Sequence, residues 1–415
     1  MRKGLWLAIV FLCASSLTAA CFISDFELWN SRDLNVADRH SVPSFEEGMG
    51  FQKQGINPGR EVRLLQVQRA LRSLQEKQDR VVTVLHMGDS HVAGDFLTDA
   101  LRINLQDTFG NAGRGLIAPP AYKYYRVSGA DYEMSGAWDL KNSRLDREAI
   151  YGVTGVSISS EKAGAIFKIE SEGADEITFH LLKDPRGGRM RVTYEGQVEE
   201  ITTRGVKGLQ LLSVSGDSAQ IETLGDGPVS VLGIDLKLAS AGVRYVNLGI
   251  PGATGEIFKR WNKPLVVAQI QALQPDLIVW NYGTNEGFDD DLDPASYEAS
   301  VKDALTLLSA AAPQADWMIV GPPDGQRRKG IGRECGDGWK IPPKLSNVKK
   351  VLQKVAEDEG HLFLDWAGMM GGSCSIRKWL DNKLAAPDHV HFTVKGYEYI
   401  GTSLAISLRD YLGLN

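Results

Sequence analysis

The chain has 415 residues, of which 43% are hydrophobic and 24% charged, and its formal net charge is -6. These values are typical of a globular protein large enough for more than one hydrophobic core, and they exclude a disordered chain or a membrane channel. The acidic balance also argues against a nucleic-acid partner, because phosphate binding needs a clustered basic surface and runs such as Arg327-Arg328-Lys329 are short.

Residues 1–20 have the order of a secretory signal peptide. Arg2 and Lys3 precede an apolar stretch, and a run of small residues follows and ends at Ala20. The apolar part is short for a transmembrane span, although an uncleaved membrane anchor stays open as an alternative. Cys21 follows Leu-Thr-Ala-Ala, which is similar to a bacterial lipoprotein box with threonine where leucine is usual. We therefore expect export, with membrane attachment through this segment or through lipid on Cys21 as a further hypothesis.

The first periodic segments follow a polar N-terminal extension at residues 21–60. Apolar residues that recur every three to four positions predict helices over Val62–Gln78 and Phe96–Phe109. A continuous apolar run predicts a buried strand over Val81–Leu85. Strand, turn and helix in this order indicate that residues 61–115 begin an α/β layer.

The pattern changes over residues 116–240, where short strand-like runs are separated by Gly, Asp and Ser. The expected strands are Ile166–Ile169, Glu176–Leu182, Met190–Tyr194, Val198–Thr203, Leu209–Val214 and Ser230–Leu238. A structureless connection of this length would be unusual in a compact domain. We therefore predict an antiparallel β-domain inserted into the α/β layer.

Strands and helices alternate again over residues 241–415. The expected strands are Val243–Leu248, Leu277–Trp280, Trp317–Val320 and His361–Asp365, and the expected helices are Pro264–Leu273, Pro294–Ala311, Leu345–Glu359 and Val394–Tyr411. This alternation predicts a parallel sheet with helices on both faces, and ligands bind such sheets at the carboxyl ends of the strands.

Polar side chains and glycines lie where several of these strands should end. Ser90 closes an apolar run in Gly-Asp-Ser-His, Gly252 and Asn285 lie in turns after two later strands, and Asp388 and His391 precede the last helix. A serine next to an imidazole that a carboxylate orients can act as a nucleophile. Other roles stay open: Ser90 could cap a helix, Gly252 could relieve backbone strain, and Asn285 could brace a turn.

The histidines allow a rival chemistry. A metal site could be built from Asp89, His91, Asp388, His389 and His391, because carboxylate and imidazole are good zinc ligands. That site would leave the glycine and the asparagine of the other two turns without a role. In the nucleophile hypothesis His91 and His389 line the pocket, whereas His86 and His361 lie in or beside apolar strands and are expected to be hydrogen-bonded core residues.

Four short sequence blocks carry a family resemblance: Gly88-Asp89-Ser90-His91, Gly252, Gly283-Thr284-Asn285-Glu286 and Asp388-His389-Val390-His391. In their order they resemble the blocks of the SGNH (GDSL-type) hydrolases, over about residues 60–115 and 240–415. The resemblance implies a three-layer α/β fold around a parallel sheet and a mechanism that needs no metal or organic cofactor.

Residue by residue, the resemblance makes Ser90 the nucleophile, His391 its general base and Asp388 the group that orients the imidazole. The physical argument agrees, because a neutral histidine can accept the serine proton and return it to a leaving alcohol. The resemblance further implies that the oxyanion is bound by the backbone N–H groups of Ser90 and Gly252 and by the side-chain amide of Asn285.

A narrower resemblance rests on His91-Val92-Ala93-Gly94-Asp95, on Gly113-Arg114-Gly115-Leu116, on the β-rich insertion and on Trp366–Trp379. These features are similar to the peptidoglycan O-acetylesterases of Gram-negative bacteria, in which the insertion resembles a carbohydrate-binding module. The resemblance implies a periplasmic or outer-membrane esterase acting on glycan strands, at the acetyl group on the C6 hydroxyl of N-acetylmuramic acid. A polysaccharide O-acetyltransferase and an inactive wall-glycan-binding protein are the alternatives.

Two further hypotheses concern the body of the exported chain. Cys335 and Cys374 are the only cysteines after Cys21, and in an oxidising compartment such a pair more often forms a disulfide than stays free. Two buried thiols that never meet are the alternative. Aromatic residues at the start of the insertion could stack on sugar rings or could be packed; they are Tyr122, Tyr124, Tyr125 and Trp138.

Overall fold

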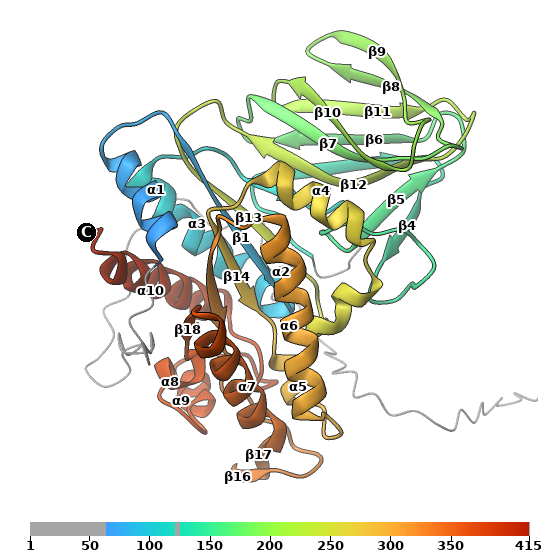
Figure 1. The fold of residues 1–415 in the computed structure, drawn as a ribbon. Coiled ribbons are helices and arrows are strands. Elements are labelled where there is room, and N and C mark those ends of the chain that lie inside the picture. Colours follow the sequence, from blue (N-terminus) through green and yellow to red (C-terminus); the bar gives the residue numbers. More distant parts are fainter. Residues whose placement is uncertain (1–63, 121–124, 415) are drawn as a thin grey trace, which may run out of the picture. The chain divides into compact units, whose positions relative to one another are not determined.

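The computed structural model describes residues 64–120 and 125–414, and these residues all belong to one compact unit (Figure 1). The expected signal peptide, the N-terminal extension, Cys21, Tyr122 and Tyr124 lie outside the described residues. In the described ranges we find no helix with the length and apolar character needed to cross a membrane.

A five-stranded parallel sheet forms the centre of the α/β part (Figure 1). In spatial order its strands are β13 (Gly242–Gly249), β1 (Val81–Gly88), β14 (Leu277–Asn281), β15 (Asp316–Val320) and β18 (Leu362–Leu364). The strands are nearly all buried, as expected of a parallel sheet covered on both faces. Because the spatial order is 2-1-3-4-5 in chain order, the winding direction changes between β1 and β14. A ligand site is expected at the carboxyl ends of these two strands.

Helices cover both faces of this sheet. One face packs against α1 (Leu65–Gln75), α3 (Phe96–Phe109) and α10 (Val394–Leu412). The other packs against α4 (Lys263–Leu273), α6 (Pro294–Ala311) and α7 (Pro343–Glu359). Successive apolar residues of β1 alternate between the two layers, with Val82 and Val84 on the first face and Leu85 and Met87 on the second.

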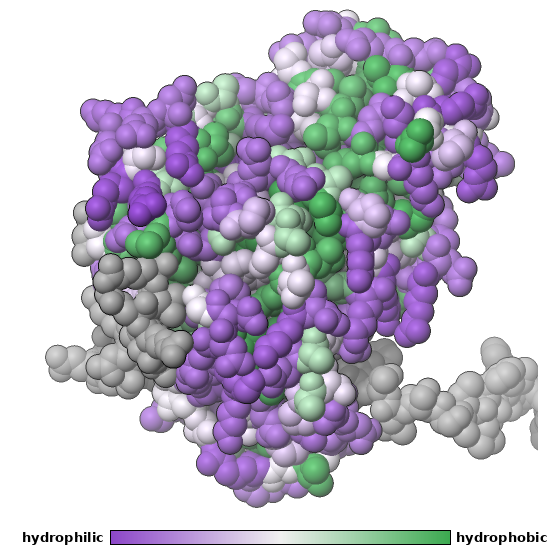
Figure 2. Space-filling view, viewed as in Figure 1, coloured by the Kyte–Doolittle hydropathy of each residue, from purple (hydrophilic) through white to green (hydrophobic). Residues whose placement is uncertain are grey.

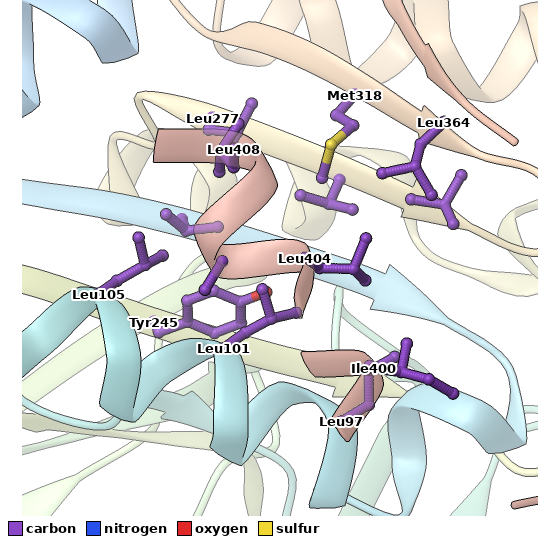
Figure 3. Close-up of a cluster of buried hydrophobic side chains, with 14 of the residues drawn as sticks. Leu97, Leu101, Leu105, Tyr245, Leu277, Met318, Leu364, Ile400, Leu404 and Leu408 are labelled. Carbon is purple, nitrogen blue, oxygen red and sulfur yellow. The ribbon is translucent and has the colours of Figure 1, made fainter. Parts of the chain in front are cut away.

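Helices α3 and α10 meet over the sheet through two rows of aliphatic residues (Figure 3). Figure 3 shows Leu97, Leu101, Leu105, Ile400, Leu404 and Leu408 against Tyr245, Leu277, Met318 and Leu364 of the strands. Each fully buried aliphatic side chain contributes roughly 1.5–3 kcal/mol relative to an exposed one. The spacing of three and four residues along α3 and α10 therefore explains why these segments are helical and which face they bury.

Local signals explain where the helices begin. The carboxylate of Asp293 accepts a hydrogen bond from the Ser296 N–H, and Pro294 occupies the first position of α6. Asn262 caps α4 in the same way, and Thr393 caps α10. The expected bounds of Phe96–Phe109 and Pro294–Ala311 are confirmed, and the other expected helices are correct to within a few residues.

The region from β2 to β12 is all-β and antiparallel. One sheet has the order β10 (Gly208–Ser215), β7 (Glu176–Lys183), β12 (Val229–Lys237), β5 (Val156–Ser160) and β4 (Asp139–Asn142), with β2 (Gly115–Ile117) also paired to β12. The other has the order β3 (Ala130–Ser135), β6 (Ile166–Ser171), β11 (Ser218–Thr223), β8 (Arg189–Tyr194) and β9 (Gln197–Thr202). Apolar residues of both sheets, among them Phe167, Phe179 and Ile221, form one buried cluster.

All six strands expected in this region are present, whereas β2, β3, β4, β5 and β11 were not expected. The unexpected strands are short or rich in polar residues, so their apolar runs give little signal on their own. On the face drawn in Figure 2 hydrophobic residues appear among hydrophilic ones over this region, where Val198, Val206 and Leu211 are exposed. The assignment of residues 116–240 to an inserted domain stays a prediction.

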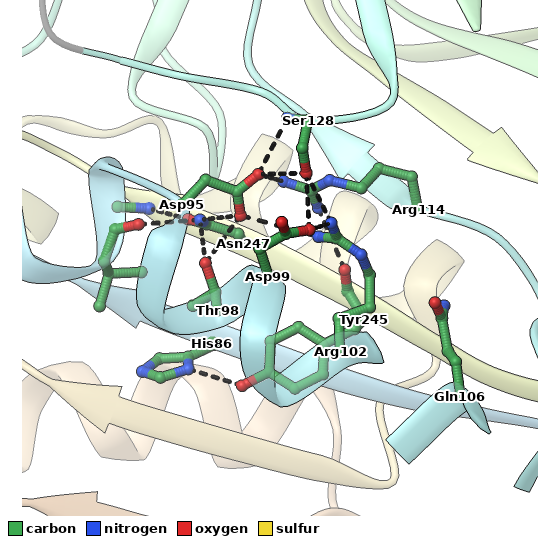
Figure 4. Close-up of polar contacts among 12 residues, drawn as sticks. His86, Asp95, Thr98, Asp99, Arg102, Gln106, Arg114, Ser128, Tyr245 and Asn247 are labelled. Carbon is green, nitrogen blue, oxygen red and sulfur yellow. Dashed lines mark hydrogen bonds and ion pairs between the residues drawn. The ribbon is translucent and has the colours of Figure 1, made fainter. Parts of the chain in front are cut away.

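A buried polar network around Asp95 joins the α/β part to the β-rich region (Figure 4). The Asp95 carboxylate accepts from Arg114 Nη2 (3.1 Å), from the N–H and hydroxyl of Ser128 (3.0 Å each) and from Asn247 Nδ2 (2.9 Å). Burial acts to raise the pKa of Asp95, but the guanidinium groups of Arg114 and Arg102 bring it below its usual range. The pairing of Asp95 with Arg114 brings the two motifs that contain them into direct contact.

A disulfide holds a hairpin near the last strand. Cys335 lies on β16 (Arg333–Gly336), which pairs with β17 (Trp339–Ile341), and is bonded to Cys374, with the two Cα atoms 5.6 Å apart. Cys374 lies between the short helices α8 (Trp366–Met369) and α9 (Ile376–Asp381). The hairpin and the two short helices were not expected from the sequence.

Candidate active site

Ser90 lies at the carboxyl end of β1, at the point where the winding of the sheet changes. The chain turns at Gly88, where a Cβ atom would lie 2.4 Å from Val92 Cγ2 and 2.7 Å from the Asn281 carbonyl oxygen. Asp89 then caps the short helix α2 (Ser90–Ala93) by accepting from the His91 N–H at 3.0 Å. The alternative role of Ser90 as the helix cap is therefore wrong, because Asp89 is the cap. The Ser90 hydroxyl remains available for other contacts.

The structure brings Ser90, His391 and Asp388 into contact in series. Ser90 Oγ lies 2.8 Å from His391 Nε2, across 301 positions of sequence, and His391 Nδ1 lies 2.7 Å from Asp388 Oδ2. The other oxygen of Asp388 accepts from the backbone N–H groups of Val390 and His391, at 2.9 Å each. These bonds close the turn before α10 and fix the plane of the imidazole relative to the serine.

Asp388 is held as an anion. Burial acts to raise its pKa, but the hydrogen bond from the His391 side chain, the charge of His391 and the two backbone N–H groups lower it to about 2. A carboxylate on Nδ1 keeps the proton on that nitrogen, so Nε2 is the atom that can accept the Ser90 proton. The side chains of His391 and Asp388 are 15% and 23% exposed, which leaves the imidazole within reach of a substrate.

The two other blocks lie at neighbouring strand ends. Gly252 follows β13 with φ +69°, and Asn285 lies in the short helix α5 (Thr284–Gly287) after β14. Asn285 Nδ2 donates to the Ala253 carbonyl at 2.8 Å, which ties the two turns together. An amide nitrogen carries a second hydrogen that this bond does not use. The roles of Gly252 and Asn285 as oxyanion donors stay a prediction.

Glu286 is a structural residue of this site that the sequence analysis did not single out. Its Oε1 accepts from the Gly255 N–H at 2.8 Å, so it holds the Gly252 turn from the block that also contains Asn285. Burial raises the pKa of Glu286 to about 8. The side chain therefore carries a proton at neutral pH. Only its position beside Asn285 in Gly-Thr-Asn-Glu could have drawn attention to it.

His389 anchors the turn on the side of the disulfide hairpin. Its ring stacks on Trp339, with centroids 3.5 Å apart and an interplanar angle of 8°, and its Nδ1 donates to Gln326 Oε1 at 3.0 Å. It lines a hollow of about 310 Å³ together with Trp339, Arg328 and Arg377. Trp339 and Gln326 had no local signal, because both are far from His389 in sequence.

His91 packs behind the His391 imidazole. It is buried, shares a hydrogen bond of 2.8 Å with the Tyr397 hydroxyl, and lies 5.3 Å from the His391 ring centroid to centroid. Burial and the charge of His391 lower its pKa well below the usual value, so it is neutral. Among residues 64–120 and 125–414 we find no three His, Cys, Asp or Glu side chains grouped so that they could hold a metal. The rival metal site is therefore not assembled by the side chains proposed for it.

Two further histidines of the described residues, His86 and His361, contact aromatic side chains; His86 is buried and His361 is partly buried. His86 hydrogen-bonds the Tyr245 hydroxyl (2.7 Å) and Asn281 Oδ1 (3.2 Å), and burial lowers its pKa to about 4. Its interpretation as a hydrogen-bonded core residue is confirmed. His361 stacks on Trp317.

The two described aromatic residues at the start of the insertion are packed. The Tyr125 hydroxyl accepts from the Ala118 N–H at 3.1 Å, and Trp138 Nε1 donates to the Ile166 carbonyl at 3.0 Å. Both rings lie against the cluster of buried residues between the two β-sheets. These contacts favour packing over sugar stacking for Tyr125 and Trp138.

Comparisons with known proteins agree with this geometry. The model of the GDSL-like lipase/acylhydrolase family matches residues 216–399. No curated protein matches the chain. A solved structure of a peptidoglycan O-acetylesterase aligns with a TM-score of 0.74 and 26% identity, over 84% of this chain and 97% of that one.

Two other solved structures align with much lower scores. One is a GDSL-like lipase of Parabacteroides merdae, with 18% identity, a TM-score of 0.30, and coverage of 42% of this chain and 74% of that one. The other is a family two carbohydrate esterase of Clostridium thermocellum, with 11% identity, a TM-score of 0.30, and coverage of 68% and 100%. The family match over residues 216–399 and the likeness to the solved peptidoglycan O-acetylesterase together support an SGNH (GDSL-type) carboxylic ester hydrolase that resembles that enzyme.

Proposed function

We propose that the chain is an exported serine esterase that removes O-acetyl groups from peptidoglycan, at the C6 hydroxyl of N-acetylmuramic acid. The observation that carries the proposal is the series Ser90, His391 and Asp388, joined by hydrogen bonds of 2.8 and 2.7 Å at the carboxyl end of the sheet. The likeness to a solved peptidoglycan O-acetylesterase over 84% of the chain supports this substrate class.

In the first half of the reaction Ser90 Oγ attacks the acetyl carbonyl carbon while His391 Nε2 takes the hydroxyl proton. The oxygen that becomes negative is bound by the N–H groups of Ser90 and Gly252 and by Asn285 Nδ2. The bond to the sugar oxygen then breaks, and His391 returns its proton to that oxygen. The products of this half are the free sugar hydroxyl and an acetyl ester on Ser90.

In the second half a water molecule attacks the acetyl ester and gives its proton to His391 Nε2. The same oxyanion donors stabilise the second tetrahedral intermediate. When it collapses, the proton returns to Ser90 Oγ and acetate leaves. Throughout both halves Asp388 stays ionised and stabilises the imidazolium, as its low pKa allows.

The proposal includes a location and a role for the β-rich region. Residues 1–20 would direct export to the periplasm or the outer membrane of a Gram-negative cell, with attachment through this segment or through lipid on Cys21. Residues 116–240 would form an inserted module that contacts the glycan strand. The antiparallel sheets of this region, and their separate buried core, support the module.

The test is acetate release from O-acetylated peptidoglycan by the purified chain and by Ser90→Ala, with acetylated xylan as a second substrate. Ser346→Ala, which changes an exposed serine on α7, is the matched control. We expect the wild type and Ser346→Ala to release acetate from peptidoglycan faster than from xylan, and Ser90→Ala to lose both activities. Native-rate release by Ser90→Ala would overturn the nucleophile, and faster release from xylan would overturn the substrate.

A further inference from the structure

An arginine from the β-rich region lies against the glycine of the proposed oxyanion site. A Cβ atom added to Gly252 would lie 2.9 Å from Nε and 3.0 Å from Cζ and Nη2 of Arg144. The guanidinium group therefore covers the side of Gly252 that a side chain would occupy. No sequence motif indicated this contact, because Arg144 lies in the β-rich region, more than a hundred positions before Gly252.

The backbone that carries Arg144 is fixed to the α/β part. Arg260 Nη1 donates to the carbonyl oxygens of Ser143 (2.8 Å) and Arg144 (2.7 Å), and Trp261 Nε1 donates to Ser143 Oγ (2.9 Å). On the other side, the Ser143 N–H donates to the Gly155 carbonyl at 2.8 Å. The backbone position of Arg144 near Gly252 is thus set by several hydrogen bonds, although the residue itself is exposed.

The guanidinium of Arg144 has no acidic partner in the described part of the chain. Its neighbour Lys141 does: the ammonium lies 3.5 Å from Asp139 and 3.3 Å from Asp146. Among residues 64–120 and 125–414, no carboxylate forms an ion pair with Arg144. A cation held beside an active site without a protein counter-ion is available to a ligand.

We propose that Arg144 binds a carboxylate of the substrate and so selects acetylated glycans that carry an acidic group close to the ester. The inference rests on the proposed esterase function and narrows its substrate class. A guanidinium presents N–H donors in a planar fork that matches a carboxylate, and it stays charged at any pH at which the enzyme works. On muramic acid the lactyl group is such a carboxylate when no peptide is attached to it.

Two other roles predict different kinetics. If Arg144 stabilised the oxyanion directly, its loss would slow the hydrolysis of every acetyl ester by a similar factor. If it only packed on Gly252, its loss would change no substrate preference. Substrate binding predicts a loss confined to substrates that carry the carboxylate.

The experiment compares wild type, Arg144→Gln, Arg144→Lys and Arg147→Gln, the last being an exposed arginine of the same loop without the Gly252 contact. The substrates are p-nitrophenyl acetate, 6-O-acetyl-N-acetylglucosamine and 6-O-acetyl-N-acetylmuramic acid with a free lactyl carboxylate. For Arg144→Gln we expect kcat/KM to fall by about tenfold on the muramic acid only, mainly through KM, and Arg144→Lys to recover part of the loss. Arg147→Gln should match the wild type on all three.

Equal losses on all three substrates, or no loss on the muramic acid, would overturn the inference. A second pair of substrates separates it from the proposed function: acetylated galacturonan, which is acidic, and acetylated xylan, which is neutral. If peptidoglycan is not hydrolysed but Arg144→Gln loses activity only toward galacturonan, the arginine site stands and the peptidoglycan assignment fails. If peptidoglycan is hydrolysed and Arg144→Gln shows no selective loss, the peptidoglycan assignment stands and the arginine site fails.

Discussion

At the scale of single residues, the proposed mechanism requires that the neutral His391 imidazole keep its proton on Nδ1. His391 can accept from Ser90 only through Nε2, and Asp388 ensures this by accepting from Nδ1 at 2.7 Å. The low pKa of Asp388, about 2, means that the carboxylate remains charged across the working pH range. Asp388 therefore contributes both a hydrogen-bond acceptor for Nδ1 and a negative charge beside the imidazole. Replacement of Asp388 by asparagine, which has nearly the same shape but no charge, tests these contributions.

Asp388→Asn should leave the fold intact and lower kcat by about three to four orders of magnitude. The amide can present its N–H to Nδ1, which favours the tautomer whose Nε2 already carries a hydrogen and cannot accept the serine proton. The measurement is steady-state hydrolysis of p-nitrophenyl acetate, with circular dichroism to check the fold. Asp381→Asn, at an exposed position, is the control; a loss of less than tenfold at Asp388 would contradict its role.

Gly252→Ala should lower kcat by about a hundredfold or more, because strain in this turn would displace the N–H group that is proposed to bind the oxyanion, whereas the exposed Arg144 guanidinium near the new Cβ can move aside. The φ of +69° adds backbone strain of about 1–2 kcal/mol for a residue with a side chain. Gly164→Ala is the matched control, since it has φ +75° and open space around its Cβ position. Similar stability losses with activity lost only at Gly252 are expected, and unchanged activity in Gly252→Ala would refute the oxyanion role.

At the scale of elements, two clamps position the loops that form the site. Glu286 on α5 holds the Gly252 turn through the Gly255 N–H, and it does so as a neutral carboxyl because burial raises its pKa to about 8. On the other side, the hairpin β16–β17 places Trp339 on His389, beside Asp388, and the disulfide ties that hairpin to Cys374. Each clamp makes a separate prediction.

The Glu286 clamp predicts a pH dependence of stability. In the unfolded chain this carboxyl ionises at its ordinary pKa of 4.5, whereas in the fold it stays protonated to about 8. Between these values the unfolded state binds fewer protons, so the free energy of unfolding should fall as pH rises. Glu286→Gln should remove this part of the slope, measured by urea unfolding at pH 5 and pH 8. The exposed Glu148→Gln should keep the slope, and an unchanged slope in Glu286→Gln would contradict the prediction.

Removal of the disulfide, as Cys335→Ser with Cys374→Ser, should lower the free energy of unfolding by about 2–4 kcal/mol, because the bond closes a loop across 39 positions. Urea unfolding of the double variant, and of the wild type with and without reductant, measures the effect. The reduced wild type should match the double variant. A double variant as stable as the oxidised wild type would show that the bond adds nothing.

At the scale of the whole molecule, the two parts of the described unit are joined by buried polar groups. The Asp95 carboxylate accepts from the N–H and the hydroxyl of Ser128 at 3.0 Å each in the network of Figure 4, and His180 of β7 contacts Gln269 of α4 at 3.1 Å. Arg144 reaches the active-site turn from the β-rich region across this junction. We therefore expect the activity of the α/β part to depend on how the β-rich region is held.

Arg114→Met should destabilise the protein by about 3–5 kcal/mol, because it leaves the buried Asp95 carboxylate without its main cation. The double variant Asp95→Asn with Arg114→Met should be more stable than Arg114→Met alone, since the unpaired charge is then gone. Chemical unfolding measures both. Arg186→Met, whose side chain is 86% exposed, should change stability by less than about 1 kcal/mol. Equal losses at Arg114 and Arg186 would contradict the account.

The sequence by itself determined the features that depend on neighbouring residues. The periodicity of α3 and α6 fixed their bounds, since a helix of that length buries one regular face, and the apolar runs located all five strands of the parallel sheet. The polar residues at the ends of β1, β13 and β14 were also visible, because parallel strands place their carboxyl ends on one edge of the sheet. Family resemblance then supplied the order of the blocks.

Only the tertiary structure decided the contacts between segments far apart in the chain. Short strands such as β5 and β11 form because the sheets around them supply hydrogen-bond partners, which no local pattern records. The placement of Trp339 on His389 and of Arg144 on Gly252 depends on how separate elements pack, not on their own sequences. Local motifs therefore indicate the chemistry of this protein, because Ser90, Gly252 and Asn285 follow strands of one parallel sheet, whereas the substrate preference that we propose for Arg144 depends on long-range packing that the motifs do not contain.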